Sequence, residues 1–219
     1  MSIANIELVN ISKKFEDKII AEEINASFDK GIYILRGENG SGKSTLLKMM
    51  MGLIYPDCGD IRLRGKSIYE LDNNMKKQIG FVFSSDRTLY YKLTAKENLM
   101  YIGRIYGLSY QKLNEKVPYL LNLLNLKTNK LVETFSTGMK KRLMVARAFL
   151  CDPSIVFLDE VFNGLDNEGK DIVERLILDE ANKKNITIIL VSHESCDVIE
   201  ESAKTVYLKE GKLYGVDSI

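Results

Sequence analysis

The sequence predicts an α/β fold that carries a mostly helical insertion at about residues 87–151. Short apolar runs typical of buried strands alternate along the chain with segments of helical periodicity. A glycine-rich loop joins one of these runs to a helical segment, an arrangement that suits phosphate binding. A length of 219 residues suits one large or two small domains, and no proline-rich linker divides it. We therefore expect one domain over residues 1–219.

The expected strands follow from the apolar pattern. Two N-terminal segments alternate apolar and polar side chains, which predicts half-exposed strands, whereas later runs are continuously apolar and predict buried ones. Residues 56–60 (P-D-C-G-D) indicate a turn. The expected strands cover residues 3–11, 19–28, 32–35, 61–63, 79–83, 155–158 and 186–191.

The expected helices have recognisable ends. Thr94 and Glu97 have the spacing of a capping box, and Gly107 marks the end of the helix that they open. A second helix is expected after Ser109, where leucine and valine repeat at helical spacing as far as Leu124. Further helices are expected to begin near residues 43, 138 and 168.

The glycine-rich loop reads G-E-N-G-S-G-K-S and has the P-loop form G-x-x-x-x-G-K-[ST]. Its glycines let backbone N–H groups turn inward to form an anion site, and the following helix points its positive end there. Lys43 is placed to reach the β- and γ-phosphates, and the Ser44 hydroxyl to ligate Mg²⁺. A glycine turn without a ligand is the alternative. We expect ATP or GTP to be bound by Gly37, Asn39, Gly40, Ser41, Gly42, Lys43, Ser44 and Thr45.

Two carboxylates, Asp159 and Glu160, end the buried strand that begins at Ile155. Ligands collect beyond the carboxyl ends of parallel strands, where the P-loop is also expected. Neighbouring strand residues point to opposite sides, so the two acids can have different roles. One can support Mg²⁺, as in the Walker B pattern, while the other orients or deprotonates the attacking water.

Three weaker sites complete the pattern. His193, the single histidine, follows the last buried strand, which favours a contact with phosphate or water. Residues 135–139 (F-S-T-G-M) open a helix and precede three basic residues, 140–142. Cations in a first helical turn oppose the macrodipole, so either this end faces an anion or the basic turn is simply solvated. Residues 164–166 (G-L-D) form a turn.

The chain resembles the ATP-binding cassette ATPases over nearly its whole length. It has their motifs in the same order: the P-loop, the F-S-T-G-M segment, the I-V-F-L-D-E strand, the G-L-D turn and the strand-end histidine. The resemblance implies a P-loop NTPase fold with a RecA-like core, an antiparallel β edge subdomain and an inserted helical subdomain. It also implies that Phe15 stacks on adenine, that Glu160 is the catalytic base, that Asp159 supports Mg²⁺, and that His193 lies near the γ-phosphate.

By the same resemblance, residues 135–139 are the signature motif, whose Ser136 and Gly138 contact the γ-phosphate bound to a second cassette. Asp166 then lies in the loop that crosses the dimer interface. The sequence departs from the family at Ser84, where a glutamine is usual, and at residues 137, 139, 161 and 162. The S-x-G-M-K pattern is similar to that of exporters of drugs, antibiotics and peptides.

Composition limits the partners. Lys+Arg number 31 and Asp+Glu 30, so bulk charge does not recruit nucleic acid or an anionic membrane. Three scattered cysteines favour reduced thiols in the cytosol, and no apolar run is long enough to cross a membrane. Together with these limits, the resemblance implies a cytoplasmic ATPase on the inner face of the cell membrane, held there by a separate permease subunit and paired with a second cassette, most simply as a homodimer. An ATPase of iron–sulfur assembly and a nucleotide-gated module without catalysis are the alternatives.

Overall fold

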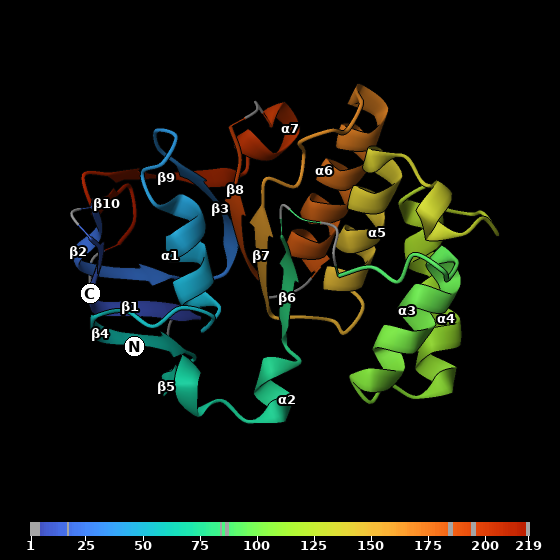
Figure 1. Ribbon diagram of the computed structural model, residues 1–219, viewed down its shortest axis with the longest axis horizontal. Helices are drawn as coiled ribbons and strands as arrows, with labels where there is room; N and C mark the ends of the chain where they lie inside the picture. The colour runs from blue at the N-terminus through green and yellow to red at the C-terminus, as the bar shows by residue number, and fades with distance from the viewer. Residues whose placement is uncertain are drawn as a thin grey trace.

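The computed structural model describes residues 5–16, 18–83, 85, 88–183, 186–193 and 196–217. Within these residues the larger sheet has the strand order β10-β9-β3-β8-β7-β6 (Figure 1). Five of its strands are parallel, and β10 pairs antiparallel with β9 at the edge. The strands are β3 (Gly31–Arg36), β6 (Ile79–Val82), β7 (Ile155–Asp159), β8 (Thr187–Val191), β9 (Ala203–Lys209) and β10 (Lys212–Tyr214).

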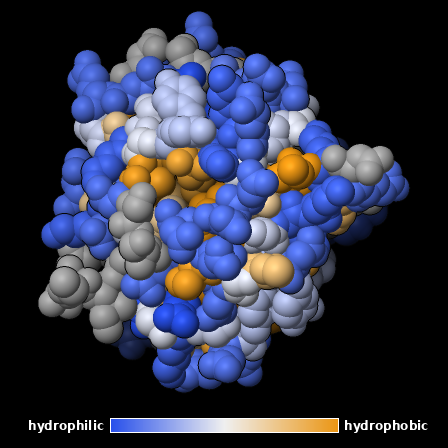
Figure 2. Space-filling view, turned by 90° about the vertical axis from the view of Figure 1, so that its left-hand side faces the viewer, coloured by the Kyte–Doolittle hydropathy of each residue, from blue (hydrophilic) through white to orange (hydrophobic). Residues whose placement is uncertain are grey.

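The smaller sheet is antiparallel and has the order β2-β1-β4-β5. Its strands are β1 (Ile6–Phe15), β2 (Lys18–Phe28), β4 (Cys58–Leu63) and β5 (Lys66–Ser67). The face of the molecule on this side is mostly hydrophilic, with small apolar patches between the charged side chains (Figure 2).

The helices divide the apolar residues into two cores. The α-helices are α1 (Lys43–Met50), α2 (Asn73–Lys76), α3 (Ala95–Ile105), α4 (Tyr110–Leu123), α5 (Thr137–Ala148), α6 (Asn167–Lys183) and α7 (Asp197–Glu200), and the 3₁₀ turns are Ile68–Glu70 and Val132–Thr134. Helix α1 fills the space between the two sheets, whereas α5 and α6 cover the other face of the larger sheet (Figure 1). Strand β3 serves both cores, since Ile32 and Ile34 point one way and Tyr33 and Leu35 the other.

The capping box is confirmed. The Thr94 hydroxyl accepts from the N–H of Glu97 at 3.2 Å, and the Glu97 carboxylate accepts from the N–H of Thr94 at 2.8 Å. The N–H of Thr94, and its hydroxyl at 2.7 Å, both donate to the Glu97 carboxylate and hold its pKa below the usual value. Helix α3 ends at Ile105, and Gly107 follows with a φ of +80°, as a glycine stop requires.

The turn predicted at residues 56–60 is wrong in its second half, because β4 begins at Cys58. Gly59 has a φ of +89°, which gave the segment its turn-like sequence. The residue nevertheless stays in the sheet, at an irregularity in the pairing of β1 with β4. Strands β9 and β10 were not predicted, since β9 buries only Val206 and Leu208 between polar neighbours.

Candidate nucleotide-binding site

The P-loop connects β3 to α1 and forms the centre of the site. Its chain turns sharply because Gly37, Gly40 and Gly42 have φ values of +155°, +78° and +102°. Lys43 is buried, and its Nζ donates to the carbonyl oxygens of Gly37 and Glu38, each at 2.9 Å. These two hydrogen bonds therefore tie the Lys43 side chain to the backbone of the loop that precedes it.

Burial lowers the pKa of Lys43 from its ordinary value. The carboxylates of Glu160 and Asp159 act in the opposite direction, because a nearby negative charge favours the ammonium form. The lysine thus faces both acids that the sequence placed at the end of β7.

Gly37 illustrates how tightly the loop is packed. A Cβ at this position would lie 2.4 Å from the carbonyl oxygen of Leu208 in β9, which is backbone and cannot rotate away. We expect Gly37→Ala to lower the free energy of unfolding by on the order of 3 kcal/mol, from this overlap and the unfavourable φ. Urea denaturation measures the loss. Gly138→Ala is the control, because its Cβ would have 3.5 Å of space; an equal effect in both variants would contradict the prediction.

The predicted metal-binding residues lie together. Ser44 in the first turn of α1 donates its hydroxyl to Asp159 Oδ1 at 3.0 Å, and Asp159 is buried at the end of β7. Hydroxyl and carboxylate oxygens are ligands that Mg²⁺ accepts, and adjacent ligands of an octahedral Mg²⁺ are about 3 Å apart. The described residues contain no group of three or more His, Cys, Asp or Glu side chains that could hold a metal. The pair therefore fits a Mg²⁺ that is also bound by phosphate oxygens.

Glu160 and His193 form the next part of the site. His193 Nε2 lies 3.3 Å from Glu160 Oε1, and the histidine side chain is 43% exposed. The other carboxylate oxygen, Oε2, is buried and has no hydrogen-bond partner among the described residues. A buried acceptor without a partner is uncommon and is consistent with a functional role for this carboxylate.

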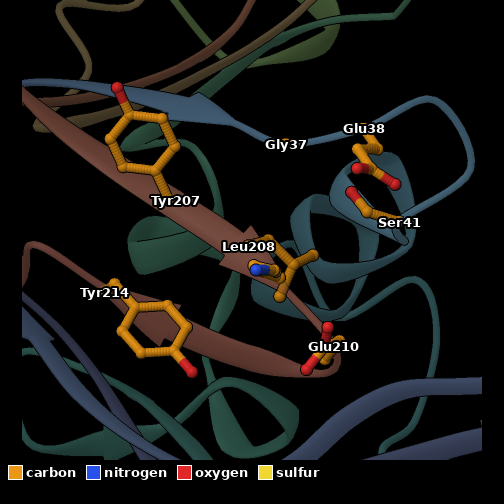
Figure 3. A pocket seen from close by; sticks show the side chains of 8 residues that line it. Gly37, Glu38, Ser41, Tyr207, Leu208, Glu210 and Tyr214 are labelled. Atoms are coloured by element: carbon orange, nitrogen blue, oxygen red, sulfur yellow. The ribbon is translucent and has the colours of Figure 1, made fainter.

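Two cavities adjoin the P-loop. The one with the predicted chemistry has a volume of about 390 Å³ and is lined by Lys18, Ile20, Asn39, Gly40, Gly42, Lys43, Ser44, Thr45, Glu160 and His193. A larger cavity of about 820 Å³ lies beside β9 and β10; Tyr207 and Tyr214 line one side of it, and Glu38 and Ser41 of the loop line the other (Figure 3). It contains neither Lys43 nor either strand-end acid, so we place the phosphates in the smaller cavity.

Phe15 lies at the end of β1, is 46% exposed and pairs in register with Lys18 of β2. Lys18 lines the smaller cavity, so the end of β1 that carries Phe15 neighbours a strand that borders this cavity, although Phe15 itself is not among the lining residues. The ammonium of Lys13 lies 5.0 Å from the centre of the ring, a cation–π contact that fixes its position.

The residues of the signature motif form a separate group that does not line this cavity. Ser136 caps α5 by accepting from the N–H of Met139 at 3.2 Å. Gly138 lies against residues 164–165, and Asp166 Oδ1 accepts from the N–H of Gly169 at 2.8 Å at the start of α6. The start of α5 is thus packed on the loop that follows Glu160.

The three basic residues after the signature motif each contact another part of the chain, so this turn is not simply solvated. Lys141 is buried, with its Nζ 3.3 Å from the carbonyl oxygen of Glu160. Arg142 donates to the carbonyl oxygen of Leu124, and the ammonium of Lys140 lies 4.8 Å from the centre of the Tyr91 ring. The interpretation as a simply solvated turn is therefore wrong, because tertiary contacts hold these cations. The interpretation that this helix end faces an anion stays a prediction.

A family model described as "ABC transporter" matches residues 22–163, which is more than half of the chain. The chain belongs to the ABC transporter family. This confirms the predicted P-loop α/β fold, ATP binding and ATPase class. The relatives below also confirm the assignment to a transporter; they do not support the two alternatives, an ATPase of iron–sulfur assembly and a non-catalytic module.

Named relatives of this ABC protein include "ABC transporter ATP-binding protein NatA" of Bacillus subtilis, 33% identical over 86% of this chain and 79% of the relative. "Bacitracin transport ATP-binding protein BcrA" of Bacillus licheniformis is 34% identical over 95% of this chain and 68% of the relative. "Nod factor export ATP-binding protein I" of Rhizobium sp. is 36% identical over 88% of this chain and 64% of the relative.

Solved structures agree on the fold. "Structure of ATP binding subunit of ABC transporter" superposes with a TM-score of 0.87, 26% identity and coverage of 99% of this chain and 90% of that chain. "Dimeric Structure of MJ0796, a Bacterial ABC Transporter Cassette" gives a TM-score of 0.81 at 24% identity, covering 97% and 98%.

The sequence did not single out Lys18 or Ile20, although both line the nucleotide cavity. They come from β2, which neighbours the P-loop only in the folded chain; a Cβ on Gly42 would lie 2.7 Å from Cγ2 of Ile20. Ser84, which replaces the usual glutamine of ABC ATPases, lies outside the described residues. No helix within the described ranges combines the length and apolarity that a bilayer span requires.

Proposed function

We propose that this ABC ATPase powers an exporter of drugs, antibiotics or peptides. The observation that carries the catalytic part is that Lys43, Ser44, Glu160 and His193 line one cavity, with the buried Asp159 bonded to Ser44. The export function is supported by the relatives named for bacitracin transport and Nod factor export. The whole chain acts as one nucleotide-binding domain, with residues of about 87–151 as its helical subdomain.

ATP binds across the smaller cavity. Phe15 stacks on adenine, and Lys18 and Ile20 line the same part of the cavity. The N–H groups of the loop, the start of α1 and Lys43 together hold the phosphates. Ser44 and Asp159 would hold Mg²⁺, which when bound would neutralise negative charge on the phosphates.

Glu160 is the general base of hydrolysis. One of its carboxylate oxygens takes a proton from water as the water oxygen bonds to the γ-phosphorus. The bond from that phosphorus to the β–γ bridging oxygen breaks, and its electron pair leaves with ADP. Lys43 stabilises the negative charge of the transition state, and His193 holds Glu160 Oε1 in place near the γ-phosphate.

The signature motif serves the nucleotide of a second cassette. Ser136, Gly138 and Asp166 do not line the cavity of their own chain, so they require a partner in head-to-tail arrangement to reach a γ-phosphate. The structures titled as dimeric cassettes have the same fold. A homodimer is the simplest assembly for this chain.

A separate permease holds the dimer on the inner face of the cell membrane. Exposed aromatic and aliphatic side chains gather around α3, where Tyr90 and Tyr101 pack edge to face with ring centres 4.9 Å apart and Ile105 is 59% exposed. A cytoplasmic helix of the permease would cover this apolar surface. Neither nucleic acid nor a direct membrane anchor has a role in the proposal.

Metal removal tests the catalytic part. We expect purified protein to release phosphate from ATP only with Mg²⁺, so excess EDTA should stop turnover and excess Mg²⁺ should restore it. Fractionation of the native cells tests the transporter part: the chain should sediment with membranes and be released by detergent. Turnover in EDTA would contradict the metal assignment, and a chain found only in the supernatant would contradict the permease.

A further inference from the structure

The backbone of Glu160 has an uncommon conformation. Its φ is +52°, in the left-handed region that residues with a side chain seldom adopt. Such a conformation persists only where surrounding contacts hold it, and such residues cluster at functional sites. The position of the Glu160 carboxylate therefore depends on what holds its main chain.

Two hydrogen bonds hold this main chain from opposite sides. The N–H of Glu160 donates to the carbonyl oxygen of Val191 in β8 at 3.0 Å. Its own carbonyl oxygen accepts from Nζ of Lys141 at 3.3 Å. The first bond ties Glu160 to the central sheet, and the second ties it to α5.

Lys141 is a costly residue to place here. It is only 6% exposed, and an ammonium removed from water must be compensated by hydrogen bonds or charge. The bond to Glu160 provides part of this compensation. Lys116, by contrast, is a partly buried lysine that forms an ion pair with Asp152 at 2.7 Å and makes no contact with this loop.

The first turn of α5 touches the loop after Glu160 at further points. The methyl carbon of Thr137 would lie 3.1 Å from a Cβ on Gly164, and a Cβ on Gly138 would lie 3.5 Å from Leu165. The start of α5 and residues 160–165 are therefore in direct contact. The Lys141 bond extends this contact to the main chain of Glu160.

We propose that Lys141 is a positioning residue that couples the signature helix to the general base. In a head-to-tail dimer, the start of α5 contacts the γ-phosphate of one site while Glu160 of the same chain acts in the other. Lys141 thus makes the position of the Glu160 main chain in one site depend on the phosphate contact made in the other site. The inference rests on the roles proposed above for Glu160 and for the signature motif.

Lys141→Met tests this role, because methionine keeps the apolar length and removes the donor. We expect kcat for Mg·ATP to fall about tenfold, which corresponds to ~1.4 kcal/mol, with KM within about twofold of wild type. Lys141→Arg keeps a cationic donor and should recover most of the rate. Lys116→Met is the matched control: it removes a partly buried lysine and should change kcat little.

The outcomes separate this inference from the proposed function. If Glu160→Gln stops turnover but Lys141→Met leaves kcat within about twofold, the coupling is wrong and the base assignment stands. If Glu160→Gln hydrolyses ATP normally, the base assignment itself fails. Where Lys141→Met does not fold by circular dichroism, Lys141→Gln takes its place; failure of both to fold would overturn the proposal, since Lys141 would then serve the fold alone.

Discussion

Lys43→Ala is expected to reduce ATP turnover by at least about a hundredfold, because it removes the cation that meets the β- and γ-phosphates. The structure adds a second reason. Lys43 Nζ also bonds the carbonyl oxygens of Gly37 and Glu38, so alanine releases the loop as well as the charge. We expect both Mg·ATP affinity and kcat to fall, in contrast to the kcat effect expected at Lys141.

Isothermal titration with a non-hydrolysable ATP analogue and a phosphate-release assay measure the two losses. Lys48→Ala is the matched control, since Lys48 lies on the same helix but outside the nucleotide cavity. Wild-type turnover by Lys43→Ala would show that the phosphates bind elsewhere. The larger cavity beside Tyr207 and Tyr214 would then be the first place to examine.

The parts of the site that sequence could predict are those encoded by neighbouring residues. The P-loop, the apolar run into Asp159 and Glu160, and the Thr94–Glu97 cap each depend on short-range geometry. The structure confirms the cap and places the Ser44 hydroxyl 3.0 Å from Asp159 Oδ1. Such motifs constrain local backbone and hydrogen bonding together, so their spacing is informative.

The parts that sequence could not predict depend on contacts distant along the chain. Leu208 restricts Gly37 from a strand more than a hundred residues away. Lys141 reaches the carbonyl of Glu160 from a helix start whose basic residues predicted either an anion site or a solvated turn. The left-handed φ of Glu160 likewise has no sequence signal, because glutamate has no preference for it. Tertiary packing determines all three features.

Glu160→Gln should separate nucleotide binding from hydrolysis. Glutamine keeps the size of the side chain and its reach to His193, which now lies 3.3 Å from Oε1, but cannot accept a proton from water. Hydrolysis should therefore nearly stop while Mg·ATP still binds. With ATP retained, Ser136 of one copy should stay against the γ-phosphate of the other, so the variant should elute as a dimer with Mg·ATP and as a monomer with ADP.

Size-exclusion chromatography with light scattering measures this dimer, and a second substitution tests its geometry. Adding Ser136→Arg should abolish it, because a long side chain would fill the space of the phosphate. Arginine also removes the α5 cap, so Ser109→Arg is the control: Ser109 caps α4 through the same type of bond, 3.2 Å long in both cases. If adding Ser136→Arg abolishes the dimer and adding Ser109→Arg does not, the signature motif lies at the interface. A Glu160→Gln protein that stays monomeric in saturating Mg·ATP would instead favour pairing with a paralogue or assembly on the permease.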